Sequence, residues 1–281
     1  MCIDFFITEV ENGHMSGKTK SPKNIQQFLV PALAIVAIGL AFLSGTLLQK
    51  VKNYEKDGNA GTATKETTQV EPSVSLDTIK GLFDKDLVKF GDVDRKVLFV
   101  EMADPSCPYC AAADGKNRSI YTSVGETFRL TADGGQYVAP GTEIQKLVNS
   151  GQASYVYIYY PGHGNGEMGM KALYCANEKG KFWEAHDLIM SDAGYTLVNT
   201  TVKNDKTKSG IVADFLKSVI DPNFTKSCLD SGKYDARLQS DQSLATSLGI
   251  QGTPTFYVNA TSFPGAYNYT DMKSAVDSAL K

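Results

Sequence analysis

The sequence predicts an α/β domain preceded by one membrane-spanning helix, and three observations lead to this prediction. Residues 28–48 form an apolar run without a charged side chain. Beyond residue 74, short β-prone runs alternate with segments in which apolar residues recur at helical spacing. Between one buried strand and the helix after it stands the motif Cys107-Pro108-Tyr109-Cys110. The net charge of −3 gives no reason to expect nucleic acid as a partner.

The first 73 residues divide into three segments by composition. Residues 1–24 are a short polar segment, 25–49 are the anchor, and 50–73 are a tether rich in Gly, Thr, Lys and Glu. The uncharged run is long enough to cross a hydrocarbon core of about 30 Å as a helix. It also exceeds the roughly 7–15 residues of a signal-peptide core. We therefore expect an uncleaved anchor, with a cleaved signal peptide as the alternative.

The placement of the five cysteines favours one orientation of this anchor. Cys2 precedes the anchor and the other four cysteines follow it. Four is an even number, compatible with two disulfides in an oxidising compartment. Lysines flank the anchor on both sides, so the positive-inside rule does not decide the orientation. We expect a single-pass protein of the cell membrane, with a cytoplasmic N-terminus and an extracytoplasmic domain over 74–281.

The first half of that domain predicts a helix, two strands and the helix that carries the motif. We expect a helix near 77–83 and then an edge strand. A nearly continuous apolar run over 96–102 is typical of a buried central strand. Asp104, Pro105 and Ser106 are turn residues, and Cys107 opens the next helix. The Asp133-Gly134-Gly135 sequence predicts a hairpin over 127–138.

The second half is mainly helical. We expect a short helix over 143–149 and a strand over 154–160, in which Tyr155, Tyr157 and Tyr159 share one face. Helical spacing recurs over 168–190 and 212–248. A strand over 255–259 and an amphipathic helix over 269–280 complete the chain.

Two cysteines separated by two residues at a strand-to-helix junction predict thiol–disulfide exchange. Cys107 lies at a helix N-terminus, where unpaired N–H groups favour the thiolate. Cys110 lies one turn later and can close the ring. Zinc sites use the same spacing, but Cys175 and Cys228 would be the other ligands and neither lies in a ligand-type pair. An inert disulfide is the second alternative. We expect no metal and no cofactor.

Three segments together resemble the DsbA-like branch of the thioredoxin superfamily. Residues 97–110 read VLFVEMADPSCPYC, residues 172–187 read ALYCANEKGKFWEAHD, and residues 248–259 read LGIQGTPTFYVN. The resemblance implies a thioredoxin-like α/β fold with a helical insertion at about 168–247. Asp114-Gly115-Lys116-Asn117 departs from the family pattern, because it breaks the helix that many relatives continue.

The resemblance also assigns roles to single residues. Cys107 matches the exposed nucleophile and Cys110 the buried resolving thiol. Pro254 matches a cis-proline beside the disulfide, and Thr253 before it would pair with a bound peptide through its backbone. Pro108 and Tyr109 would contact the same substrate. Glu101 matches a buried acid that relays the Cys110 proton.

Cys175 and Cys228 lie in separate helical segments, and we expect a structural disulfide that staples the helical insertion. A second redox pair and two unpaired thiols are the alternatives. His186 is expected to be packed on its helix rather than catalytic. His163, between two glycines, is expected in a solvated loop.

The function that follows is a membrane-anchored oxidoreductase that forms disulfides in exported proteins. Its expected partners are reduced exported proteins and a membrane quinone-linked reoxidising protein of the DsbB or vitamin K epoxide reductase type. A reductase or isomerase is the first alternative. A non-catalytic thioredoxin-fold binding module is the second.

Overall fold

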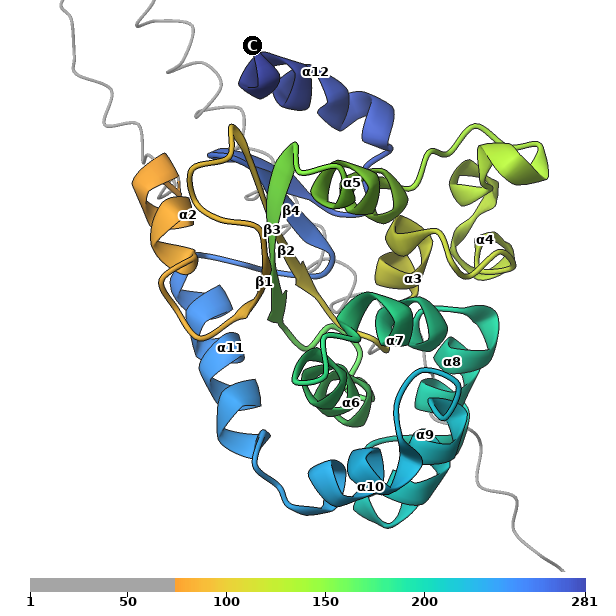
Figure 1. Ribbon diagram of the computed structural model, residues 1–281. Helices are drawn as coiled ribbons and strands as arrows, with labels where there is room; N and C mark the ends of the chain where they lie inside the picture. The colour runs from red at the N-terminus through yellow and green to blue at the C-terminus, as the bar shows by residue number, and fades with distance from the viewer. Residues whose placement is uncertain (1–73) are drawn as a thin grey trace, which may run out of the picture. The chain divides into compact units, whose positions relative to one another are not determined.

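The computed structural model describes residues 74–281 (Figure 1). The expectations for residues 1–73, including the anchor and the tether, lie outside the described residues. Within 74–281, none of the helices combines the length and apolar character needed to cross a membrane.

A five-stranded mixed sheet forms the centre of the domain, in the order β1-β3-β2-β4-β5. β2 and β3 run parallel, and the other neighbouring pairs run antiparallel. Every residue of β2 and β3 is buried, as in central strands covered on both faces. The strands are β1 (Val88–Phe90), β2 (Val97–Ala103), β3 (Ala153–Tyr159), β4 (Thr255–Val258) and β5 (Thr261–Pro264).

Helices cover both faces of this sheet (Figure 1). On one face, Leu98 and Val100 pack with the apolar residues of α2 (Leu76–Leu82) and α11 (Asp235–Ser247). On the other, Phe99 and the β3 tyrosines pack against a larger group of helices. Alternate side chains of one strand therefore supply two separate cores. The three tyrosines of β3 share one face, as predicted.

The remaining helices surround the larger core or connect its parts. In chain order they are α3 (Pro108–Asp114), α4 (Tyr121–Val124), α5 (Pro140–Asn149), α6 (Glu167–Asn177), α7 (Phe182–Ile189), α8 (Asp192–Thr196), α9 (Ser209–Phe215), α10 (Pro222–Asp230) and α12 (Tyr269–Leu280). Four short 3-10 or π segments are η1 (Glu126–Phe128), η2 (Thr131–Asp133), η3 (Leu197–Val202) and η4 (Lys206–Lys208).

The periodicity predictions for the main elements are confirmed. The helix near 77–83 is α2, capped by Ser75, whose hydroxyl accepts from the Thr78 N–H at 3.1 Å. The strands expected over 96–102 and 154–160 are β2 and β3, and the terminal helix is α12. Helices α6 to α11 occupy the chain between β3 and β4.

The hairpin predicted over 127–138 is wrong. Instead of two paired strands, the segment holds η1, η2 and a single isolated bridge between Leu130 and Tyr137. The N–H groups of Arg129, Asp133 and Gly134 donate to carbonyls three residues earlier, as in 3-10 turns, so they do not pair across a ladder.

The edge strand β5 was not predicted. β4 ends at Val258, and Asn259 adopts a positive φ of 52° that turns the chain into β5. β5 is largely exposed and carries Thr, Ser and Pro, so it has no apolar alternation to reveal it.

Candidate active site

The cysteine motif lies where β2 passes into α3. Cys107 is the N-cap of α3 and has an extended backbone, and Pro108 takes the first helical position, which proline favours. The Cys107 N–H donates to the Asp104 carbonyl at 2.9 Å. Both thiols are free, so the structure is that of the reduced protein.

The expectation of an exposed Cys107 is wrong. Its side chain is 0% exposed. The thiol donates to the Thr253 carbonyl oxygen at 3.3 Å. Gly162 also lies against Cys107, since a Cβ added at Gly162 would be 3.5 Å from the Cys107 Cβ. The nucleophile is covered by segments remote in sequence.

The two thiols differ strongly in acidity. A hydrogen bond from Cys110 lowers the pKa of Cys107 to about 6 against the opposing effect of burial, with further help from the Thr253 side chain and from the charge of His163. Burial, followed by the hydrogen bond with Cys107, raises the pKa of Cys110 well above its ordinary value. Cys107 is therefore the thiolate at neutral pH, and Cys110 holds the proton.

Glu101 is buried in β2, at the centre of the sheet rather than at its edge. Burial raises the pKa of its carboxyl to about 7, and the hydrogen bond from the Tyr155 hydroxyl, at 2.6 Å, opposes that rise. Its charge also contributes to the raised pKa of Cys110. A group with a pKa near neutrality can both accept and return a proton.

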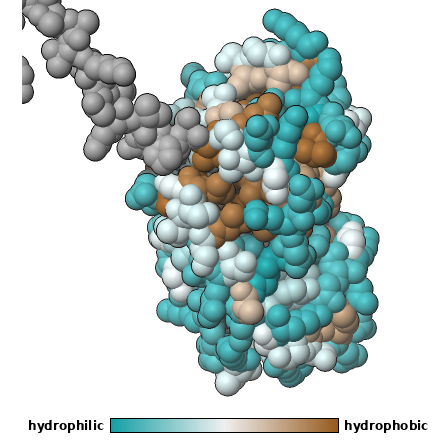
Figure 2. All heavy atoms as spheres, turned by 90° about the vertical axis from the view of Figure 1, so that its left-hand side faces the viewer, coloured by the Kyte–Doolittle hydropathy of each residue, from teal (hydrophilic) through white to brown (hydrophobic). Residues whose placement is uncertain are grey.

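The Thr253–Pro254 peptide bond is cis. The Thr253 carbonyl is the group that accepts from Cys107, and the Pro254 carbonyl accepts from the Gly265 N–H at 2.8 Å. An open groove of about 970 Å³ continues along residues 248–255 toward β5. Figure 2 shows apolar side chains gathered in the middle of the face that carries α2 and α11.

Of the two residues between the cysteines, Tyr109 is the more accessible. Its side chain is 42% exposed, and its ring lies edge-on to Phe128, with the ring centroids 5.6 Å apart. Pro108 is half-buried at the start of α3. The hairpin expected over 127–138 does not predict a contact between Phe128 and Tyr109, which η1 provides.

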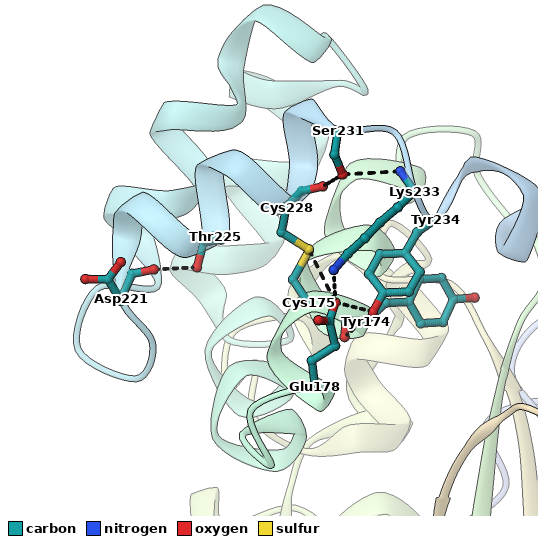
Figure 3. The surroundings of a disulfide bond; sticks show 9 residues. All are labelled: Tyr174, Cys175, Glu178, Asp221, Thr225, Cys228, Ser231, Lys233 and Tyr234. Atoms are coloured by element: carbon teal, nitrogen blue, oxygen red, sulfur yellow. Dashed lines mark hydrogen bonds and ion pairs between the residues drawn. A yellow bond between two sulfur atoms is a disulfide. The ribbon is translucent and has the colours of Figure 1, made fainter.

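Cys175 of α6 and Cys228 of α10 are joined in a disulfide, which is the pairing that the sequence favoured (Figure 3). Figure 3 also shows Glu178, Lys233 and Tyr234 around the bond. The Tyr234 hydroxyl and the Lys233 ammonium both bind the Glu178 carboxylate. The zinc alternative fails, because its two further ligands are bonded to each other.

His186 is packed in the core, as predicted. It is stacked on Phe182, with ring centroids 5.3 Å apart, and burial lowers its pKa to about 3. Among residues 74–281, the only group of three side chains with metal-ligand spacing comprises His186, Asp114 and Asp187. The Lys116 ammonium already binds Asp187 at 2.8 Å, so this group is neutralised by a cation of the chain itself.

Sequence reasoning missed two residues of the site. Asp104 begins a turn, as predicted, and its buried carboxylate also accepts four hydrogen bonds, which the sequence does not predict. His163 lies in an exposed loop, as expected, yet its charge acts on Cys107. The position of Asp104, directly after a buried strand and three residues before Cys107, is a sequence signal for a role at the site. No neighbouring residue in the sequence indicates that His163 lies near Cys107.

Comparisons with known proteins identify proteins of similar sequence and fold. Residues 141–278 match the thioredoxin family model. Disulfide bond formation protein D of Bacillus subtilis is 23% identical over 198 residues, which cover 68% of this chain and 76% of that protein. The Na(+)/H(+) antiporter NhaA 3 of Salinispora tropica is 27% identical over 201 residues, 70% of this chain.

The crystal structure of Wolbachia pipientis α-DsbA1 has the same fold. It superposes with a TM-score of 0.51 at 16% identity and covers 69% of this chain and 91% of that one. The present chain spans only about a quarter of the length of the antiporters that it matches. The chain therefore carries a domain of thioredoxin-like fold.

Proposed function

We propose that the chain is a membrane-anchored, extracytoplasmic thiol–disulfide oxidoreductase that forms disulfides in exported proteins. One observation carries the proposal: Cys107, with a pKa of about 6, lies against both Cys110 and the Thr253 carbonyl. A low-pKa thiolate is a good leaving group, so a disulfide that contains Cys107 is readily transferred to another dithiol.

The reaction transfers two electrons from the substrate dithiol, which is oxidised, to the Cys107–Cys110 disulfide, which is reduced, by exchange of bonds between sulfurs. In the oxidised protein, a substrate thiolate attacks Cys107, forms a mixed disulfide and expels Cys110 as a thiolate. The second substrate thiolate then attacks the substrate sulfur and expels Cys107. The substrate leaves with a disulfide and the protein becomes a dithiol.

Glu101 supplies the proton step of this cycle. Cys110 leaves as a thiolate, although burial disfavours its charge. The Glu101 carboxyl, with a pKa of about 7, supplies a proton for that thiolate and recovers it on reoxidation. Glu101 acts through Cys110 and needs no contact with substrate.

The direction, location and partners are also part of the proposal. Disulfide bond formation protein D supports the oxidising direction by its name. The apolar run over 28–48 and the disulfide between Cys175 and Cys228 support an anchored domain in an oxidising compartment. A quinone-linked membrane protein of the DsbB or vitamin K epoxide reductase type would reoxidise it, and the anchor would raise their effective concentration.

The first experiment is titration of the full chain with glutathione, with Cys107→Ser as the inactive control. A reduction potential near the DsbA value of about −120 mV would support a disulfide donor, whereas one near the thioredoxin value of about −270 mV would favour a reductase. No reversible exchange at all would leave the binding module, which keeps its partner in the Cys107→Ser variant.

Protease accessibility in intact cells tests the location. The extracytoplasmic domain should be cleaved by external protease, with a cytoplasmic protein as control. Protection of the domain in intact cells, with cleavage only after lysis, would contradict this part of the proposal.

A further inference from the structure

Asp104 is a buried carboxylate that the proposed exchange reaction does not use. Its side chain is 0% exposed. One oxygen accepts from the N–H and the hydroxyl of Ser106, at 2.8 and 2.7 Å. The other accepts from the backbone N–H groups of Gly162 and His163, at 2.7 and 2.9 Å. Asp104 thus joins the segment before Cys107 to a loop 58 residues away.

This loop, the 161–166 loop, comprises residues 161–166. Two of its glycines allow it to lie close to Asp104 and Thr253. A Cβ at Gly166 would lie 1.7 Å from the Asp104 carboxylate, and one at Gly162 would lie 2.2 Å from the Thr253 hydroxyl. A second tie runs from the Asn165 N–H to the Ser106 hydroxyl, at 3.3 Å. The loop therefore lies directly against Cys107 and Thr253.

We propose that Asp104 is a positioning residue that holds the 161–166 loop against Cys107, and that this loop limits the size of the group that reaches the Cys107 sulfur. The inference deepens the proposed function and rests on it, because it concerns access of a reactant to the redox thiol. Thr253 and the loop together cover the Cys107 side chain, which is 0% exposed. Opening of the loop then sets the width of the approach, so small reactants reach the sulfur more readily than bulky ones.

A size-ratio experiment separates this role from a general contribution to stability. The reduced full chain reacts with N-ethylmaleimide and, separately, with a maleimide that carries a polyethylene glycol chain. Modification of Cys107 is followed by peptide mass mapping. Both reagents use the same chemistry, so a change in thiolate fraction cancels in the ratio of their rates.

Three variants weaken the loop contact in different ways. Asp104→Asn replaces an acceptor that faces N–H groups with a donor. Ser106→Ala removes the tie to Asn165 without a change of charge. Gly162→Ala places a methyl group against Thr253 and pushes the loop outward. If one of them fails to fold, the other two still test the inference.

Each variant should raise the rate of the bulky reagent relative to the small one. A hydrogen bond to a charged group is worth enough to change loop opening by about tenfold, so we expect the ratio to rise by about that factor in Asp104→Asn. The matched controls are Asp241→Asn, which alters an equally buried carboxylate elsewhere, and Gly81→Ala, which meets open space. Neither control should change the ratio.

An unchanged ratio in all folded variants would overturn the inference. A ratio that rises equally in Asp241→Asn would do the same, because the effect would then be loss of stability. The readout needs only a reduced Cys107 thiol. A chain without oxidase potential would therefore refute the proposed function while still reporting on Asp104.

Discussion

Cys107 and Glu101 are each held away from their ordinary acidity by different neighbours. Cys107 is acidified first by the hydrogen bond from Cys110, to a pKa of about 6. Burial makes Glu101 a weaker acid than an ordinary glutamate and raises its pKa to about 7. At neutral pH the site therefore combines a thiolate with a carboxyl that can exchange its proton.

Alkylation of Cys107 by iodoacetamide should rise through a midpoint near pH 6, well below that of a free thiol at about 8.5. Cys110→Ala should move this midpoint upward, because it removes the largest stabilisation of the thiolate. The rate at pH 6 should fall by about tenfold for each pKa unit gained. An unchanged midpoint in Cys110→Ala would show that another group acidifies Cys107.

Glu101 should make the domain less stable as pH rises. Its folded pKa of about 7 exceeds its ordinary value of 4.5, so its favourable contribution is present below pH 4.5 and is lost as pH rises through 7. Glu101→Gln should remove this dependence. Above pH 7 the variant should be more stable than the parent by about 3 kcal/mol in urea unfolding. Parallel stability–pH curves would contradict the buried acid.

At the scale of elements, α6 is the helix that ties the helical region together. Cys175 bonds it to α10. The Tyr174 hydroxyl donates to Asp241 of α11 at 2.6 Å, and Asp241 also accepts from Arg237 at 2.8 Å. A covalent link and a buried polar network thus act on one helix from two sides.

Replacing both Cys175 and Cys228 with alanine should lower the free energy of unfolding by about 4 kcal/mol at most, since the bond closes a loop of 53 residues. The glutathione potential of the Cys107–Cys110 pair should stay the same in this variant. A second redox wave from Cys175 and Cys228 in the parent would instead assign them a redox role.

Asp241→Asn should lower the free energy of unfolding by about 2 kcal/mol, because a buried partner of Tyr174 and Arg237 loses part of its bonding. The alkylation midpoint of Cys107 should not move. A shifted midpoint would mean that α11 is coupled to the redox site.

At the scale of the whole molecule, the redox state and the folding stability are linked. The reduced protein gains from a stabilised Cys107 thiolate, and the disulfide form lacks this gain. Urea unfolding at neutral pH should therefore show the oxidised chain to be less stable than the reduced chain. A more stable oxidised form would contradict the role of disulfide donor and agree with a reductase.

Local patterns in the sequence predicted most elements and the chemistry of the motif. The apolar run of β2, the turn residues before Cys107 and the helical spacing of α12 depend only on neighbours along the chain. The prediction for 127–138 is wrong, because Asp133-Gly134-Gly135 is also compatible with the end of a 3-10 helix. β5 escaped notice, because an exposed edge strand carries no apolar pattern.

What the sequence determined by itself was the class of chemistry: two thiols one helical turn apart after a buried strand. Only the tertiary structure decided that Cys107 is covered, since the covering carbonyl of Thr253 lies 146 residues away. It also decided that Asp104 bonds the 161–166 loop. The reason is physical: helix and strand patterns report contacts within a few residues, whereas pKa shifts and access arise from burial among segments that only folding brings together.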